Sequence, residues 1–178
     1  MVVAIATATV VAMASQNRKL FLNKVTNCKG YENSTLNWYD VTIERDPTTK
    51  DFTFSLKLRV IKEVSTKLEI EFNVWKCDAA GSLDSCEYFI KGMKNKNICQ
   101  IISQKHTFWS PFVEHFQPPL RCPIKPGVYE SKKVPFQSSL VQLFPGNSFW
   151  KSQMKGFDNG LIISCAETDL KVNTERHG

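Results

Sequence analysis

The sequence predicts an all-β domain, an antiparallel two-sheet sandwich or cup with one helical insertion and disulfide bonds. Several segments alternate apolar and polar residues with a period of two, as half-buried strands do. The six cysteines are an even number in a short chain, which is typical of domains held by disulfides. A length of 178 residues suits one domain with a sizeable core and leaves little room for two.

Composition excludes several classes of protein. With 42% hydrophobic and 22% charged residues, the chain is neither disordered nor collagen-like nor a multi-span membrane protein. The formal net charge is +6. A globular domain remains as the default.

The first fourteen residues read as a signal peptide, followed by a single domain over residues 15–178. They carry no charge, and Ala12-Met13-Ala14 has the form of a signal-peptidase site, with cleavage after Ala14. The alternative is a buried N-terminal strand. Asn33-Ser34-Thr35 is a glycosylation sequon, so we expect a glycan on Asn33. These features predict a secreted, extracellular protein.

The six cysteines allow fifteen disulfide pairings, and sequence alone does not choose among them. Spacing suggests one set. Cys77 and Cys86 bracket a polar turn between two strand-like runs and would close a hairpin end. Cys99 and Cys122 bracket a helix-like segment and would fix it to the strand that follows. Cys28 and Cys165 are left to tie the two ends of the domain together.

The strands are expected in order along the chain. Residues 36–45 are rich in strand formers and end at a turn-forming cluster over residues 46–50. Residues 52–60 alternate apolar and polar side chains, and residues 68–75 repeat the pattern and are predicted to be their antiparallel partner.

From residue 97 to residue 116 the apolar period changes to three and four, which predicts an amphipathic helix. Pro111 should break it, with Ser110 opening a short second turn. Strands are expected again over residues 127–131, 136–144, 150–157 and 161–172, with Pro135 interrupting the first two. Asn159-Gly160 between the last two predicts a tight hairpin.

Groups for catalysis are sparse. His106, His115 and His177 share no metal-ligand spacing, and the chain has no nucleophile motif, phosphate-binding loop or zinc-binding cysteine pair. We therefore expect no enzymatic activity, metal or cofactor. Export and the lack of an aromatic-plus-basic module argue against nucleic acid.

Aromatic residues are plentiful, and they cluster at the predicted helix end and on the alternating strands. An apolar helix edge over an apolar sheet face would fill a core or wall a cavity, and the space between two sheets is the usual place for an apolar ligand. The residues predicted to line such a cavity are Phe52, Phe54, Leu56, Leu58, Leu68, Ile70, Phe72, Val74, Ile101, Phe108, Trp109 and Phe112.

A basic stretch over residues 91–97 includes Lys91, Lys94 and Lys96. It reads as a solvated loop, or as a surface for anionic lipid headgroups, a membrane or a receptor. This leaves two functions open. One is a carrier of a lipid or other hydrophobic small molecule. The other is a protein-binding module or co-receptor with a filled core, whose basic loop docks an acidic partner. In either case we expect a monomer.

The order of motifs is familiar. A cysteine near the mature start is followed by Trp75-Lys76-Cys77, then Cys86, Cys99, Cys122-Pro123 with Gly127-Val128-Tyr129, and Cys165 on a last strand. Over about residues 20–172 the chain resembles insect secreted proteins related to the ganglioside activator, including chemosensory B-type proteins, within the MD-2-related lipid-recognition group.

The resemblance implies a β-cup that holds a lipid between two sheets and has no enzymatic activity by itself. It further implies presentation of the lipid to a membrane receptor in pheromone detection, or to a hydrolase. The chain has six cysteines where the ganglioside activator has eight, so one disulfide of that protein has no counterpart here.

Overall fold

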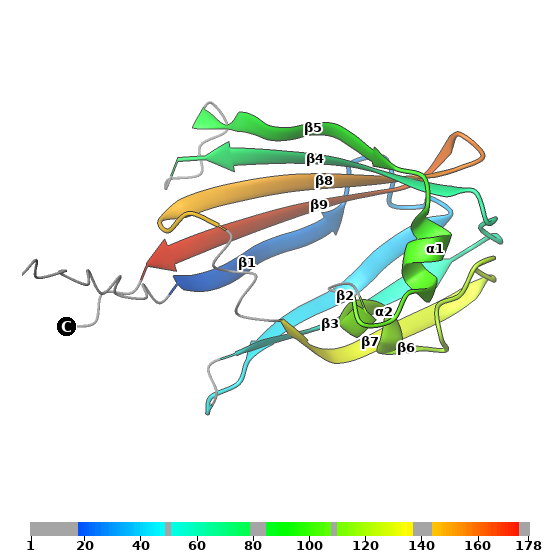
Figure 1. Ribbon diagram of the computed structural model, residues 1–178, viewed down its shortest axis with the longest axis horizontal. Helices are drawn as coiled ribbons and strands as arrows, with labels where there is room; N and C mark the ends of the chain where they lie inside the picture. Colours follow the sequence, from blue (N-terminus) through cyan, green and yellow to red (C-terminus); the bar gives the residue numbers. More distant parts are fainter. Residues whose placement is uncertain (1–17, 49–50, 79–84, 108–109, 137–143, 175–178) are drawn as a thin grey trace, which may run out of the picture.

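Two antiparallel sheets face each other in the computed structural model, which describes residues 18–48, 51–78, 85–107, 110–136 and 144–174. The predicted signal peptide lies outside these residues. The five-stranded sheet has the order β1-β9-β8-β4-β5 and the four-stranded sheet the order β2-β3-β7-β6 (Figure 1). The strands are β1 Arg18–Asn27, β2 Leu36–Arg45, β3 Phe52–Val60, β4 Leu68–Cys77, β5 Glu87–Asn95, β6 Phe116–Gln117, β7 Gly127–Phe136, β8 Ser148–Asp158 and β9 Leu161–Thr174.

The two strongest alternating segments form strands as predicted, but their predicted pairing is wrong. β3 pairs with β2 and β7, whereas β4 pairs with β5 and β8 in the opposite sheet. Between them the chain crosses the sandwich, and Val64 forms a bridge with Ile124 on the way. Alternation identifies a strand with one buried face, but it carries no information about the neighbouring strand.

β7 runs through Pro135, where the sequence predicted an interruption. Proline lacks the N–H that a central strand needs, so it is tolerated where one side of the strand has no partner. β6 pairs only with Glu130 and Ser131 of β7. Pro135 lies beyond that pairing, opposite Thr53 of β3. The predicted strand over residues 136–144 falls mostly outside the described residues.

The Asn159-Gly160 hairpin is confirmed. Asp158 pairs with Leu161, so two residues connect β8 and β9. Both have positive φ, 50° at Asn159 and 78° at Gly160. This is the conformation that a two-residue hairpin with matching twist requires, and Asn and Gly adopt it most readily.

The helical insertion is shorter than predicted. The sequence predicted a helix over residues 97–116 that breaks at Pro111, whereas the described residues contain α1, Ile98–Ser103, and α2, Ser110–Glu114, followed by β6. The first helix therefore ends before Pro111, and Pro111 lies in the first turn of the second. Ser110 does open the second helix, and its hydroxyl accepts a hydrogen bond from the N–H of Thr107 at 2.9 Å. In Figure 1, α1 lies between the two sheets and contacts β4, whereas α2 lies against the four-stranded sheet and contacts β7.

The main core gathers at the end of the sandwich where β2 begins and β3 ends. Leu36, Leu58, Val64 and Ile124 are buried there, with Ile98 of α1 beside them. A second, smaller cluster holds Trp150, Leu20 and Val172. The two sheets diverge toward the opposite end, where β1 begins and β2 ends (Figure 1). Buried side chains therefore close one end of the cup.

Candidate functional site

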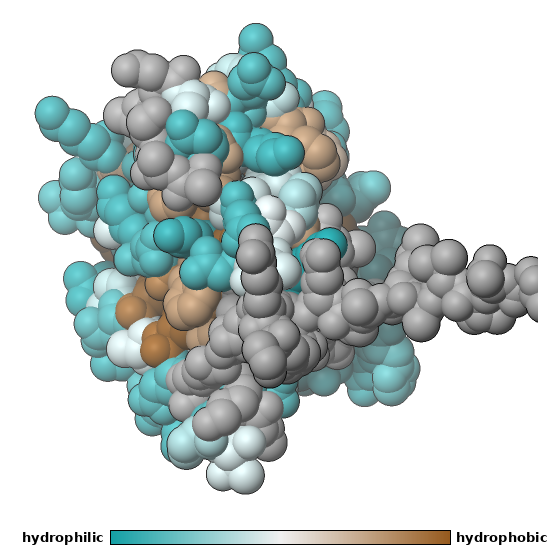
Figure 2. All heavy atoms as spheres, turned by 90° about the vertical axis from the view of Figure 1, so that its left-hand side faces the viewer, coloured by the Kyte–Doolittle hydropathy of each residue, from teal (hydrophilic) through white to brown (hydrophobic). Residues whose placement is uncertain are grey.

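An apolar cavity of about 230 Å³ lies between the two sheets, toward the end where they diverge. The five-stranded sheet contributes Leu20, Leu22 and Val25 from β1 and Thr168 and Leu170 from β9. The four-stranded sheet contributes Val41 and Ile43 from β2 and Phe52, Phe54 and Leu56 from β3. Figure 2 views this end of the molecule, and apolar atoms are visible between the hydrophilic outer surfaces.

On two of the strands that line the cavity, β3 and β9, every second side chain faces it. Phe52, Phe54 and Leu56 are every second residue of β3, so all three point to the same face of their sheet. On β9, Thr168 and Leu170 have the same relation. β1 and β2 are the neighbouring edge strands of the two sheets, and they contact each other beside the cavity.

Phe112 of α2 is the lining residue that comes from outside the sheets. Its ring lies 5.1 Å from that of Phe54, centroid to centroid, with a tilt of 38° between the planes. This contact attaches α2 to the cavity wall, as predicted for a helix that covers the apolar face of the strands.

The side chains that line the cavity are uncharged and almost all apolar. Its lining contains no titratable residue, and ten of its eleven residues are apolar. The exception is Thr168, whose hydroxyl has no hydrogen-bond partner among the described residues. Such a surface favours apolar ligands and offers one polar group to a ligand oxygen.

Of the twelve residues that the sequence predicted for the lining, four line the cavity, two lie outside the described residues and six lie elsewhere in the fold. Phe52, Phe54, Leu56 and Phe112 line the cavity. Phe108 and Trp109 lie outside the described residues. The remaining six lie elsewhere: Leu58 and Leu68 are in the main core, Ile70 and Ile101 pack against it, Val74 packs on the Trp150 cluster, and Phe72 is half-buried on β4 outside the cavity lining.

Sequence reasoning missed the contribution of β1, β2 and β9. No strand was predicted over residues 18–27, although Leu20 and Leu22 are separated by the strand period. Val41 and Ile43 show the same period within a segment that was predicted to be a strand. These alternations of apolar residues could have predicted the lining residues on β1 and β2 that were missed.

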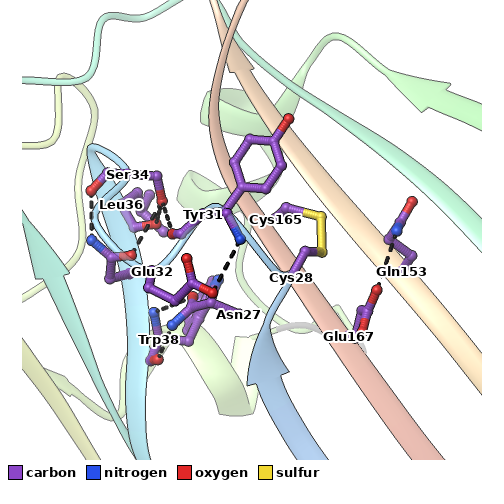
Figure 3. Close-up of a disulfide and its surroundings, with 12 residues drawn as sticks. Asn27, Cys28, Tyr31, Glu32, Ser34, Leu36, Trp38, Gln153, Cys165 and Glu167 are labelled. Carbon is purple, nitrogen blue, oxygen red and sulfur yellow. Dashed lines mark hydrogen bonds between the residues drawn. A yellow bond between two sulfur atoms is a disulfide. The ribbon is translucent and has the colours of Figure 1, made fainter.

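Three disulfides hold the cup, and they are the pairs that the spacing suggested. Cys28–Cys165 joins the end of β1 to β9, Cys77–Cys86 closes the β4–β5 end, and Cys99–Cys122 ties α1 to the segment before β7. Figure 3 shows Cys28–Cys165 beside the turn that leads into β2. In that turn, the backbone N–H groups of Glu32 and Gly30 donate to the Glu32 carboxylate and lower its pKa. Asn33 of the sequon is exposed there.

The basic segment is an edge strand, which corrects the prediction of a loop. Lys91 and Lys94 lie in β5, the outermost strand of the five-stranded sheet. Lysine on an edge strand discourages pairing with other chains. Lys94 forms an ion pair with Glu71 at 3.5 Å and Lys96 one with Glu69 at 4.0 Å, so neighbouring carboxylates offset part of the positive charge.

Other kinds of site are absent from the part of the chain that the structure describes. No group of three or more His, Cys, Asp or Glu side chains is arranged to hold a metal ion within that part. Nor does any of its helices have the length and hydropathy to cross a membrane.

The model of the ML domain, the MD-2-related lipid-recognition domain, matches residues 23–172. The chain belongs to the ML domain family. The matched region of this ML domain contains all three disulfides and nine of the eleven residues that line the apolar cavity, and Leu20 and Leu22 lie just before it.

No curated protein sequence matches this ML domain at a significant level. Among solved structures, a Niemann-Pick type C2 protein from Japanese carpenter ant is similar, with 18% sequence identity, a TM-score of 0.38, and coverage of 74% of this chain and 88% of that chain.

Proposed function

We propose that this ML domain is a secreted, non-enzymatic carrier that holds an apolar chain of a lipid or other hydrophobic small molecule between its two sheets. The observation that carries the proposal is the apolar cavity lined from both sheets. Membership of a lipid-recognition family supports the same function.

The size of the cavity limits what enters it. Pockets that enclose drug-sized ligands have volumes of roughly 300–1,000 Å³, and this cavity measures about 230 Å³. One unbranched chain suits that volume better than a lipid with two long chains. Each methylene transferred from water into an apolar site contributes ~0.8 kcal/mol before the entropy of association is subtracted.

The molecule that receives the ligand is inferred from the resemblance of the sequence to insect secreted proteins related to the ganglioside activator. We propose that the carrier presents its ligand to a membrane receptor in chemosensory detection, or to a hydrolase. We also propose that the protein is secreted after removal of residues 1–14 and that it carries a glycan on the exposed Asn33. Lys91, Lys94 and Lys96 on and beside β5 are the surface proposed to contact anionic headgroups or a receptor.

The alternative, a protein-binding module with a filled core, has less support. The described residues leave an apolar cavity between the sheets, where that function needs packed side chains. Its docking surface is also weaker than the sequence suggested, because Glu69 and Glu71 pair with two of the three lysines.

The proposal is tested by native mass spectrometry, with organic extraction, of protein purified from a eukaryotic secretion host. A co-purifying lipid or long-chain hydrocarbon is expected. The secreted protein should also begin at residue 15 and carry a glycan, which the same spectra report.

A pair of tryptophan substitutions tests whether the cavity is the site. Val41→Trp fills the cavity and should abolish binding of a fluorescent fatty acid, whereas Thr42→Trp places the same side chain on an exposed neighbour and should not. Equal binding by both variants, with circular dichroism showing both folded, would contradict the proposal. So would a protein that purifies without ligand and binds neither fatty acid nor ganglioside probes.

A further inference from the structure

A second pocket, of about 320 Å³, lies on the other face of the five-stranded sheet. Its lining includes Lys24 of β1, Asp169 and Glu167 of β9, Lys151 and Gln153 of β8, and Trp75 of β4. Leu170 lines the inner cavity, so its neighbour Asp169 points outward, and the same alternation places Lys151 beside the buried Trp150. We call this pocket the outer groove.

The register of the strands places its residues in rows that cross the sheet. Trp75 pairs with Lys151, Lys151 with Asp169, and Asp169 with Lys24. On the other side, Trp75 pairs with Tyr88 of β5. One row therefore crosses the sheet. It begins with the two aromatic side chains on β5 and β4 and continues with charged side chains of alternating sign on β8, β9 and β1. The adjacent row holds Gln153 opposite Glu167.

The aromatic end of the row is ordered by its own contacts. The rings of Trp75 and Tyr88 lie 5.0 Å apart with a tilt of 40°. The Nζ atom of Lys91 lies 5.0 Å from the centre of the Tyr88 ring. Trp75 is half-buried, so part of its indole remains accessible to a ligand in the groove.

The charged groups of the groove are not paired with one another. Within the described residues, Lys24, Lys151, Glu167 and Asp169 form no ion pair with one another. Gln153 donates a hydrogen bond to Glu167 at 3.4 Å, and the two side chains lie next to each other in Figure 3. Two lysines and two carboxylates give the groove no net charge, so it has no preference for an anion or a cation.

We infer that the outer groove binds a neutral saccharide. Sugar hydroxyls both donate and accept hydrogen bonds, which matches carboxylates, an amide and ammonium groups placed side by side. The C–H face of a sugar ring carries partial positive charge and stacks on the negative face of an indole. Neither feature is used by the apolar cavity, so this inference does not depend on the proposed carrier function.

The test is titration of the full secreted chain with uncharged trisaccharides, namely maltotriose, cellotriose and triacetylchitotriose, with binding measured by calorimetry and saturation-transfer NMR. Phosphatidylcholine vesicles that contain glucosylceramide present a neutral sugar on a membrane, and vesicles without it are the blank. At least one probe should bind. Trp75→Ala and Asp169→Asn should each weaken that binding about tenfold, the loss of ~1.4 kcal/mol.

The matched control is Tyr39→Ala. Tyr39 also lies beside cations, with Arg59 at 4.9 Å from its ring, but on a strand of the other sheet. The Tyr39→Ala variant should bind the saccharide as the unmodified protein does. All three variants, Trp75→Ala, Asp169→Asn and Tyr39→Ala, should keep fatty-acid binding. Loss on Trp75→Ala with free trisaccharides identifies a soluble ligand, and loss only with vesicles identifies a membrane glycolipid. Binding that neither groove variant weakens, or no binding to any probe, overturns the inference.

Discussion

Asn27 binds both polar backbone groups of Trp38. Its side-chain amide donates to the Trp38 carbonyl at 2.9 Å and accepts from the Trp38 N–H at 3.2 Å. Asn27 is the last residue of β1, and Trp38 lies near the start of β2 in the other sheet. One side chain thus replaces a strand neighbour and joins the edges of the two sheets next to Cys28 (Figure 3).

Replacing Asn27 with Ala should lower the free energy of unfolding. Two backbone groups of Trp38 lose their partner, and each unsatisfied buried group costs about 1–3 kcal/mol, so a loss of ~2 kcal/mol is expected after water replaces part of the bonding. Urea unfolding measures it. Asn23→Ala, at an exposed position on the same strand, is the control and should stay within about 0.5 kcal/mol of the unmodified protein.

Replacing Phe112 with Ala should weaken fatty-acid binding about tenfold with little loss of secondary structure. The ring covers the cavity against Phe54, and removing it exposes apolar ligand surface to water at ~25 cal/mol per Å². Fluorescent fatty-acid titration measures the change. Phe149→Ala removes an equally large ring outside the cavity lining and should leave the affinity unchanged.

Thr168→Val should alter which ligands are preferred. The substitution keeps the shape of the side chain but removes the one hydroxyl of the lining. A net hydrogen bond contributes ~1 kcal/mol, so a long-chain alcohol or ester should bind about fivefold more weakly, and an alkane of equal length should not. Competition against one fluorescent probe compares both ligands in one assay. An equal change for both would show that the hydroxyl does not contact the ligand.

The wall of the cavity shows which parts of a site can be inferred from sequence. Phe52, Phe54 and Leu56 were predicted because alternation is a property of one strand. Phe72 and Val74 were predicted on the same ground, yet β8 and β9 separate their strand β4 from β1. Strand order depends on contacts between residues far apart in the chain, which a single alternation does not encode.

Removing the Cys28–Cys165 disulfide should destabilise the protein more than removing Cys77–Cys86. The first bridge joins residues 137 positions apart and the second residues 9 apart. In the chain-entropy model, losses of about 5 and about 3 kcal/mol are expected. Paired Cys→Ala variants unfolded in urea provide the comparison. Equal losses would mean that native contacts around each bridge outweigh the entropy of the unfolded chain.

Affinity should rise with the chain length of a saturated fatty alcohol and then stop rising. Each methylene that enters the cavity adds ~0.8 kcal/mol, about fourfold in affinity. The gain ends when the lining, which encloses about 230 Å³, is full. Isothermal titration of an alcohol series locates that length. Leu170→Ala enlarges the cavity and should move the limit to a longer chain, whereas Lys171→Ala on the neighbouring, outward position should not move it. An affinity that climbs without limit would instead indicate binding along the exposed surface.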